Sequence, residues 1–241
     1  MEVITEDKLR YLAGKYSFNI LYLEKDYFLT ILLYMIKDVD GIYFKGGTCL
    51  NKVFLTHKRL SEDLDFAAIG EIQKLKKQIQ TAIDKDIFPK LEIDKTTKDF
   101  IRYHIFFNSY FQEQSYIILD MNKKASIHLK PEIHKLDNFY NLDFKIKTLN
   151  IEEIVAEKIR ALIVRNQPRD YFDAYWILKK YKLNKALLKI KLKEANEEYD
   201  INRVFKNANR IYSKWESDLS PLINKKISFL TVINFLKKSL E

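Results

Sequence analysis

Two patterns of apolar and polar positions follow one another along the chain. Between residues 6 and 38 the apolar positions recur at helical spacing, and the run "YFLTILLYMI" is apolar enough to be a buried helix. Five strand-like runs come next, namely "GIYFKGG", "LDFAAI", "KLEIDKT", "FIRYHIFFN" and "SYIILDMN", with the amphipathic helix "EIQKLKKQIQTAIDKDI" between the second and the third. This alternation predicts a mixed sheet with flanking helices.

The strands are predicted to stop at Asn150. The segments "NIEEIVAEKIRALIVRN" and "PRDYFDAYWIL" have helical period, and further helices are expected near 184–198, 201–216 and 221–238. We therefore predict an α+β protein with two domains. Residues 1–148 form an α/β domain with N-terminal helices, and residues 149–241 form a helical domain that completes the active-site cleft.

A glycine pair directly follows the first strand-like run. The chain has only five glycines, and Gly46 and Gly47 are adjacent. Glycine permits positive φ and close backbone approach. Thr48 is expected to cap a helix that reaches about Lys58, and the free N–H groups of such a helix suit a phosphate. An ordinary tight turn is the alternative interpretation.

Two carboxylates begin the next strand. Asp63 and Asp65 are two residues apart, so on a strand both side chains point to the same face. Two like charges side by side destabilise a fold unless a cation neutralises them, and Mg²⁺ prefers carboxylate and phosphate oxygens. Two exposed aspartates at a solvated strand end are the alternative.

A lysine and an aspartate occupy apolar positions in the helical half. On a helix, Lys158 falls near the middle of an apolar stripe, and Asp173 lies deep in an aromatic helix. Such burial is costly unless the charge is paired or reaches a polar cleft. A buried ion pair between the two residues and a site in which both meet substrate remain open at this point, as does a lysine that extends from the helix edge to solvent.

Charge and cysteine content add limits on partners and compartment. The net charge of +9 favours a polyanionic partner such as nucleic acid or nucleotide phosphate, although a Lys-rich composition alone also gives a basic protein. Cys49 is the only cysteine, which fits a reducing compartment. No run of about 18 apolar residues suggests a membrane span. We expect a cytoplasmic protein with no membrane partner.

The spacing of these residues resembles known enzymes. A strand, a glycine pair, a helix and then Asp-x-Asp resembles the polymerase-β-like nucleotidyltransferase superfamily. The longer pattern is similar to the first motif of the AbiEii/AbiGii toxin family (MenT-like), and Lys158 followed by Arg-Asp-x-x-Asp resembles the downstream motifs of the same toxins. The residues that carry the first match are Gly46, Gly47, Thr48, Leu50, Arg59, Ser61, Asp63 and Asp65.

The resemblance implies a role for each matched residue. The residues implied in catalysis are Asp63, Asp65, Lys158 and Asp173. Those implied in binding the nucleoside triphosphate (NTP) are Gly46, Gly47, Thr48, Arg59 and Ser61. A third strand carboxylate is common in the superfamily, as a metal ligand or general base, and Asp120 is the candidate because it ends an apolar strand. Asp63, Asp65 and Asp120 are then the implied Mg²⁺ ligands, with Glu92 and Asp94 as rivals for the third position.

The implied function is that of a toxin from a toxin–antitoxin (abortive infection) system. Such an enzyme transfers nucleotides from an NTP to an RNA acceptor, here the 3′ end of a tRNA, and inhibits translation and growth. A cognate antitoxin protein is the implied partner. The alternatives are a non-catalytic nucleic-acid or protein-binding module on the same fold, and a transferase that acts on a protein hydroxyl.

Overall fold

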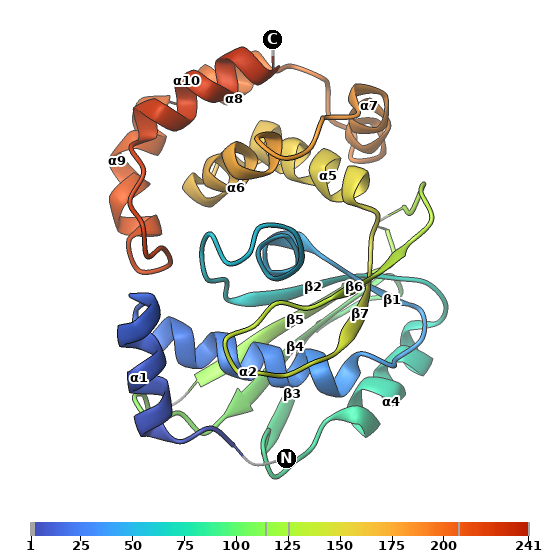
Figure 1. Cartoon of the computed structure of the whole chain (residues 1–241). Helices are drawn as coiled ribbons and strands as arrows, with labels where there is room; N and C mark the ends of the chain where they lie inside the picture. The colour runs from blue at the N-terminus through green and yellow to red at the C-terminus, as the bar shows by residue number, and fades with distance from the viewer. Residues whose placement is uncertain (1–2, 114, 125, 207, 241) are drawn as a thin grey trace. The chain divides into compact units, whose positions relative to one another are not determined.

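The computed structural model describes residues 3–113, 115–124, 126–206 and 208–240 (Figure 1). The chain divides into two compact units, Met1–Leu149 and Asn150–Glu241. The first contains all the described strands, and the second contains helices alone among its described residues. The predicted α+β class is confirmed.

A seven-stranded mixed sheet is the centre of the first unit, with strand order β3-β4-β5-β2-β1-β7-β6. The β2–β5 and β1–β7 pairs are parallel, and the other pairs are antiparallel. The last two strands were not predicted, because they are four residues long and carry too few apolar positions to stand out. The strands are β1 (Ile42–Lys45), β2 (Asp63–Ala68), β3 (Lys90–Thr96), β4 (Phe100–Phe107), β5 (Ser115–Asn122), β6 (Glu132–Lys135) and β7 (Lys145–Thr148).

The first unit also has helices before, between and beside its strands. They are α1 (Glu6–Tyr16), α2 (Ile20–Ile36), α3 (Gly46–Cys49), the π-helical turn η1 (Leu50–Phe54) and α4 (Ile72–Ala82). Helix α2 contacts β5, and α1 and α4 each contact α2 (Figure 1). Along β2 and β5 the buried Leu64 and Leu119 alternate with partly exposed acidic residues. Since strand side chains alternate between faces, the acids lie on the face opposite to the apolar core.

Helix α5 is central to the second unit, where it contacts α6, α7 and α8. Helix α6 in turn contacts α9 and α10. The last helix begins eight residues later than predicted from the pattern at 221, because turns and bends occupy the segment after Leu219. The helices are α5 (Ile151–Val164), α6 (Pro168–Leu178), α7 (Lys185–Glu194), α8 (Asn202–Lys206), α9 (Ala208–Leu219) and α10 (Phe229–Leu240).

Candidate active site

The glycine turn joins β1 directly to a helix. Gly46 has φ +76°, so the chain leaves the strand and enters α3 at Gly46 itself. The prediction that Thr48 caps this helix is wrong, because the cap position is Lys45 and the Thr48 hydroxyl donates to the backbone carbonyl of Asp63. The helical segment also ends at Phe54, short of the predicted end. Thr48 is buried and ties the glycine turn to the start of β2.

Gly46 makes room for a candidate catalytic side chain. A Cβ atom at Gly46 would lie 2.2 Å from Oδ2 of Asp65, 2.8 Å from its Cγ and 2.9 Å from its Cβ. The Asp65 carboxylate therefore packs directly on the backbone of the turn. Glycine is required here for two reasons: its positive φ and the space that Asp65 occupies.

Gly46→Ala is expected to destabilise the protein by about 1–3 kcal/mol through backbone strain, and by more through the clash with Asp65. Rotation of the Asp65 side chain cannot relieve the clash, because its Cβ is itself too close. Gly70→Ala is the matched control, since Gly70 has φ +99° but open space around the added Cβ. Denaturant unfolding of both variants measures the difference. Equal losses would mean that the contact with Asp65 adds nothing.

Strand pairing aligns four charged residues across the sheet. Asp65 on β2 lies opposite Lys45 on β1 and opposite Asp120 on β5, and Asp120 lies opposite Arg102 on β4. The two acids are therefore neighbours in this row, with a basic residue on either side of them. Asp63 lies two residues before Asp65, on the same face. Lys45 and Arg102 were not identified from the sequence, because only the strand order brings them beside the acids.

Arg102 holds the candidate third carboxylate in a bidentate pair. Its Nε donates to Oδ1 of Asp120 over 2.8 Å, and its Nη2 donates to Oδ2 over 2.7 Å. The hydrogen bonds to Asp120 raise the pKa of the Arg102 guanidinium above its usual value, against the effect of burial. The pair offsets the repulsion between Asp120 and the neighbouring Asp65. The rivals Glu92 and Asp94 lie on β3, which β4 and β5 separate from β2.

Asp63, Asp65 and Asp120 make up the acidic face of the sheet. The oxygen atoms of this face are of the kind that Mg²⁺ prefers. Asp63 and Asp65 supply hard carboxylate oxygens, and Mg²⁺ is usually held by one or two carboxylates together with substrate phosphates and water. Within the described residues, no group of three or more His, Cys, Asp or Glu side chains is arranged to hold a metal ion. Two carboxylates plus phosphate oxygens are therefore the donor set to consider, and Asp120 as a metal ligand stays a prediction.

The loop before β2 is fastened to the glycine turn by Asn51. Its side chain donates to the carbonyl of Gly47 over 3.0 Å and accepts from the backbone N–H of Arg59 over 3.2 Å. The Arg59 guanidinium is buried and donates to the carbonyl of Leu60 and, at 3.4 Å, to the Ser61 hydroxyl. The structure thus connects the candidate NTP-binding residues of the turn and of the loop. Asn51 was not identified from the sequence, because its two bonding partners become neighbours only in the folded chain.

A buried lysine anchors the helical segment behind the turn. Lys52 Nζ lies 2.7 Å from the Asp26 carboxylate and 2.9 Å from the Thr30 hydroxyl, both on α2. Burial lowers the pKa of Lys52, while the charge of Asp26 opposes that shift. The Tyr140 hydroxyl also contacts Asp26, at 3.1 Å. This ion pair, which sequence reasoning missed, fixes the turn against α2.

A second charged cluster lies within the helical unit. Lys158 Nζ is 2.9 Å from Oδ2 of Asp173 and 3.3 Å from Oδ1 of Asp170, and all three side chains are buried. Arg165 donates to both oxygens of Asp170, over 2.8 and 2.7 Å. The pairing of Lys158 with Asp173 is one of the three arrangements that the sequence left open. The roles of Asp170 and Arg165 were not predicted.

Acidification is expected to weaken the helical unit through Asp170. Burial raises the pKa of this carboxyl, but Lys158 and the hydrogen bonds from Arg165 outweigh burial and leave the pKa below its usual 3.8. A carboxyl whose pKa is lower in the folded than in the unfolded protein stabilises the fold at pH values above its unfolded-state pKa. This contribution disappears as the pH falls through the folded-state pKa. Stability should therefore fall below about pH 4. Denaturant unfolding between pH 7 and acid measures the slope.

The variant that checks this pH dependence is Asp170→Asn. It removes the titrating group, so the variant should start less stable at neutral pH and lose less on acidification than the unaltered protein. Asp218→Asn, which changes a carboxylate of the same unit outside the cluster, is the control. An unchanged acid slope in Asp170→Asn would assign the loss to other carboxyls.

Comparisons with known proteins relate the chain to a protein family and to solved structures. A sequence model of the family described as "Nucleotidyl transferase AbiEii toxin, Type IV TA system" matches residues 31–231. Among curated proteins no match was found. No described helix is both long enough and apolar enough to cross a bilayer.

Three solved structures share the fold. MenT4, a nucleotidyltransferase toxin from Mycobacterium tuberculosis H37Rv, is 16% identical with a TM-score of 0.70, covering 98% of this chain and 88% of its own. JHP933 from Helicobacter pylori is 21% identical with a TM-score of 0.65, and the match covers 92% of this chain and 91% of JHP933. A putative nucleotidyltransferase from H. pylori is 20% identical with a TM-score of 0.62, over 91% of this chain and 92% of its own.

Proposed function

The chain belongs to the AbiEii family of nucleotidyltransferase toxins from toxin–antitoxin systems, and on this premise we propose that it transfers nucleotides from an NTP to the 3′ end of a tRNA. Such a modification blocks aminoacylation, and therefore translation and growth. The observation that carries the proposal is the placement of Asp65 on the Gly46 backbone, beside Asp120 and two residues after Asp63. The net charge of +9 favours an RNA acceptor.

The acidic face is proposed to hold the reacting phosphates. Asp63 and Asp65 would hold Mg²⁺, and the chemistry that the ion supplies is positive charge against the triphosphate oxygens. The backbone of Gly46 and Gly47, with the Ser61 hydroxyl, would bind the phosphates that leave. Thr48 and Arg59 are buried. We therefore propose that Thr48 positions β2 and that Arg59 positions Ser61.

The proposed reaction is an in-line displacement at the α-phosphorus. The hydroxyl oxygen of the acceptor forms the new P–O bond, the bond to the β-phosphate oxygen breaks, and pyrophosphate leaves with its electron pair. The hydroxyl proton passes to a carboxylate or to water, and Asp120, held in place by Arg102, is the candidate base. Lys158 is proposed to offset phosphate charge and Asp173 to orient Lys158.

Incubation with labelled substrates tests this function. The purified protein is mixed with each α-³²P-labelled NTP in turn, Mg²⁺ and total tRNA, and the products are separated into RNA and protein. Label in tRNA is the expected result, and its removal by treatment that trims the 3′ end would locate it. Label in protein alone would replace the proposal with transfer to a protein hydroxyl. Absence of label with every NTP would favour a non-catalytic binding module.

A further inference from the structure

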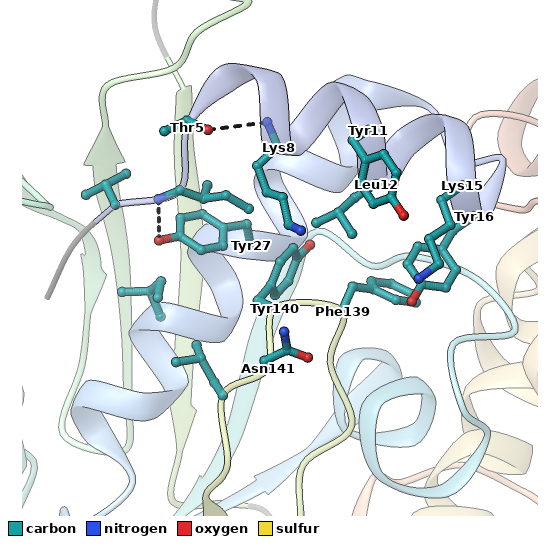
Figure 2. A pocket seen from close by; sticks show the side chains of 14 residues that line it. Thr5, Lys8, Tyr11, Leu12, Lys15, Tyr16, Tyr27, Phe139, Tyr140 and Asn141 are labelled. Carbon is teal, nitrogen blue, oxygen red and sulfur yellow. Dashed lines mark hydrogen bonds between the residues drawn. The ribbon is translucent and has the colours of Figure 1, made fainter.

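A pocket of about 520 Å³ lies between α1, α2 and the loop at residues 139–142 (Figure 2). Its volume is within the usual range of small-molecule sites. The pocket belongs to the first unit and is separate from the acidic face, since none of the candidate catalytic residues lines it. Five aromatic rings contribute to its wall, from Tyr11, Tyr16, Tyr27, Phe139 and Tyr140.

The positive charge of this pocket comes from two lysines on one face of α1. Lys8, Tyr11, Leu12 and Lys15 have the i, i+3, i+4, i+7 spacing that puts four residues on one side of a helix. Leu12 is buried, and the two lysines lie one turn before and one turn after Tyr11. Lys8 Nζ is 5.1 Å from the centre of the Tyr11 ring, and Lys15 Nζ is 5.2 Å from that of Tyr16. Among the described lining residues there is no carboxylate.

Hydrogen bonds hold the walls of the pocket in place. The backbone N–H of Ile4 donates to the Tyr27 hydroxyl over 3.0 Å, which fastens the start of the chain to α2. The Asn138 side chain accepts from the N–H groups of Tyr140 and Leu142 and donates to the carbonyl of Leu142, and thereby shapes the loop. The Tyr140 hydroxyl reaches Asp26, as described above. A pocket with such fixed walls needs little reorganisation to bind a ligand.

We propose that this pocket binds one unpaired nucleotide. The base would stack on the rings of Tyr11, Tyr16 and Phe139, and its phosphate would contact the ammonium groups of Lys8 and Lys15. Aromatic rings interleaved with lysines are the combination by which proteins bind single-stranded nucleic acid. Asn141, which lies beside the aromatic rings, offers both a donor and an acceptor to a base edge (Figure 2).

The nucleotide has two possible sources with the same chemistry, a free mononucleotide and a single strand of RNA. If the proposed function is correct, the strand belongs to the RNA acceptor, and this identification alone rests on that function. The pocket is connected to the glycine turn by contacts from Tyr140 to Asp26 and from Asp26 to Lys52. Binding of a nucleotide itself requires neither catalysis nor metal.

Binding to the full chain tests the proposal. Asp63→Ala protein in EDTA, which cannot hold a metal-bound NTP, is titrated into fluorescein-labelled hexa-adenylate RNA, and anisotropy gives the Kd. Tyr11→Ala should raise the Kd about tenfold, since loss of one stacking ring costs on that order. Lys15→Gln should weaken binding and reduce the slope of log K against log salt by about 0.7. Tyr11 is 58% exposed, so its removal should leave the fold intact.

Two variants on α9 are the matched controls. Tyr212 is 69% exposed, and Lys214 is exposed on the same helix, so Tyr212→Ala and Lys214→Gln repeat both changes at residues that do not line the pocket. Both should bind the RNA as the parent does. Competition by AMP would indicate a site for free mononucleotides, and binding of RNA without competition by AMP would indicate a site for a strand.

Two results would overturn the proposal. One is an unchanged Kd in both Tyr11→Ala and Lys15→Gln, and the other is no binding of either RNA or AMP by the parent protein. Neither result bears on nucleotide transfer, which is measured separately with the unaltered protein, labelled NTP and Mg²⁺. The failure of this site and the failure of the proposed function are therefore distinguishable.

Discussion

Asp63→Asn is expected to abolish nucleotide transfer while the protein stays folded. The carboxylate is proposed to hold Mg²⁺ against the triphosphate, and loss of one group that acts on transition-state charge typically lowers the rate by about 10²–10³-fold or more. The fold should tolerate the change, because asparagine has nearly the shape of aspartate and keeps the backbone carbonyl that accepts the hydrogen bond from Thr48. Release of labelled pyrophosphate and thermal unfolding measure the two effects.

Asp143→Asn is the matched control for this variant. Asp143 lies in the same unit and its side chain is 78% exposed, so the same loss of charge occurs away from the acidic face. Its transfer rate should equal that of the unaltered protein. A folded Asp63→Asn protein that transfers nucleotides at the normal rate would contradict the assigned role of the acidic face. Loss of transfer in both variants would point to a general effect of net charge.

Local periodicity was sufficient to predict that Asp63 and Asp65 share a face. Side chains two apart on any strand do so, whatever the rest of the sheet is like. The position of Asp120 beside Asp65 could not be predicted from local periodicity. Asp120 is in register with Asp65 because β2 pairs in parallel with β5, although β3 and β4 intervene along the chain. Strand order of this kind has no local signature. Asp120 was therefore chosen by its place at the end of an apolar strand and by resemblance, and Arg102 was missed.

The glycine turn shows the same division between local and tertiary causes. A strand followed by two glycines predicts a turn, and the structure has one at Gly46. Thr48 is of a residue type that often caps helices, but its hydroxyl donates a hydrogen bond to the start of the following strand. Tertiary contact thus overrides the capping preference. The space that Gly46 leaves for Asp65 likewise depends on the pairing of β1 with β2.

In the helical unit, periodicity predicted the burial of Lys158 correctly. It also placed Asp173 inward, so the ion pair follows from two helices that each carry one charge in an apolar face. The contribution of Arg165 could not be predicted, because its side chain leaves the end of α5 and returns to Asp170 at the start of α6. That return depends on the geometry of the short connection between the helices.

Lys158→Met is expected to destabilise the protein by about 3–5 kcal/mol, because it leaves Asp170 and Asp173 buried without their shared cation. Arg165 still pairs with Asp170 and offsets part of its charge. The double variant Lys158→Met/Asp173→Asn should recover much of the loss, since it removes both charges together. Denaturant unfolding of the full chain measures each free energy, with Lys193→Met as the exposed control.

The double variant also separates a structural role of Lys158 from a catalytic one. If the lysine only stabilises the helical unit, the refolded double variant should transfer nucleotides at nearly the normal rate. If Lys158 offsets phosphate charge, transfer should stay about 10²–10³-fold low although stability is recovered. We expect the second result. A Lys158→Met protein as stable as Lys193→Met would instead show that the buried ion cluster contributes nothing to folding.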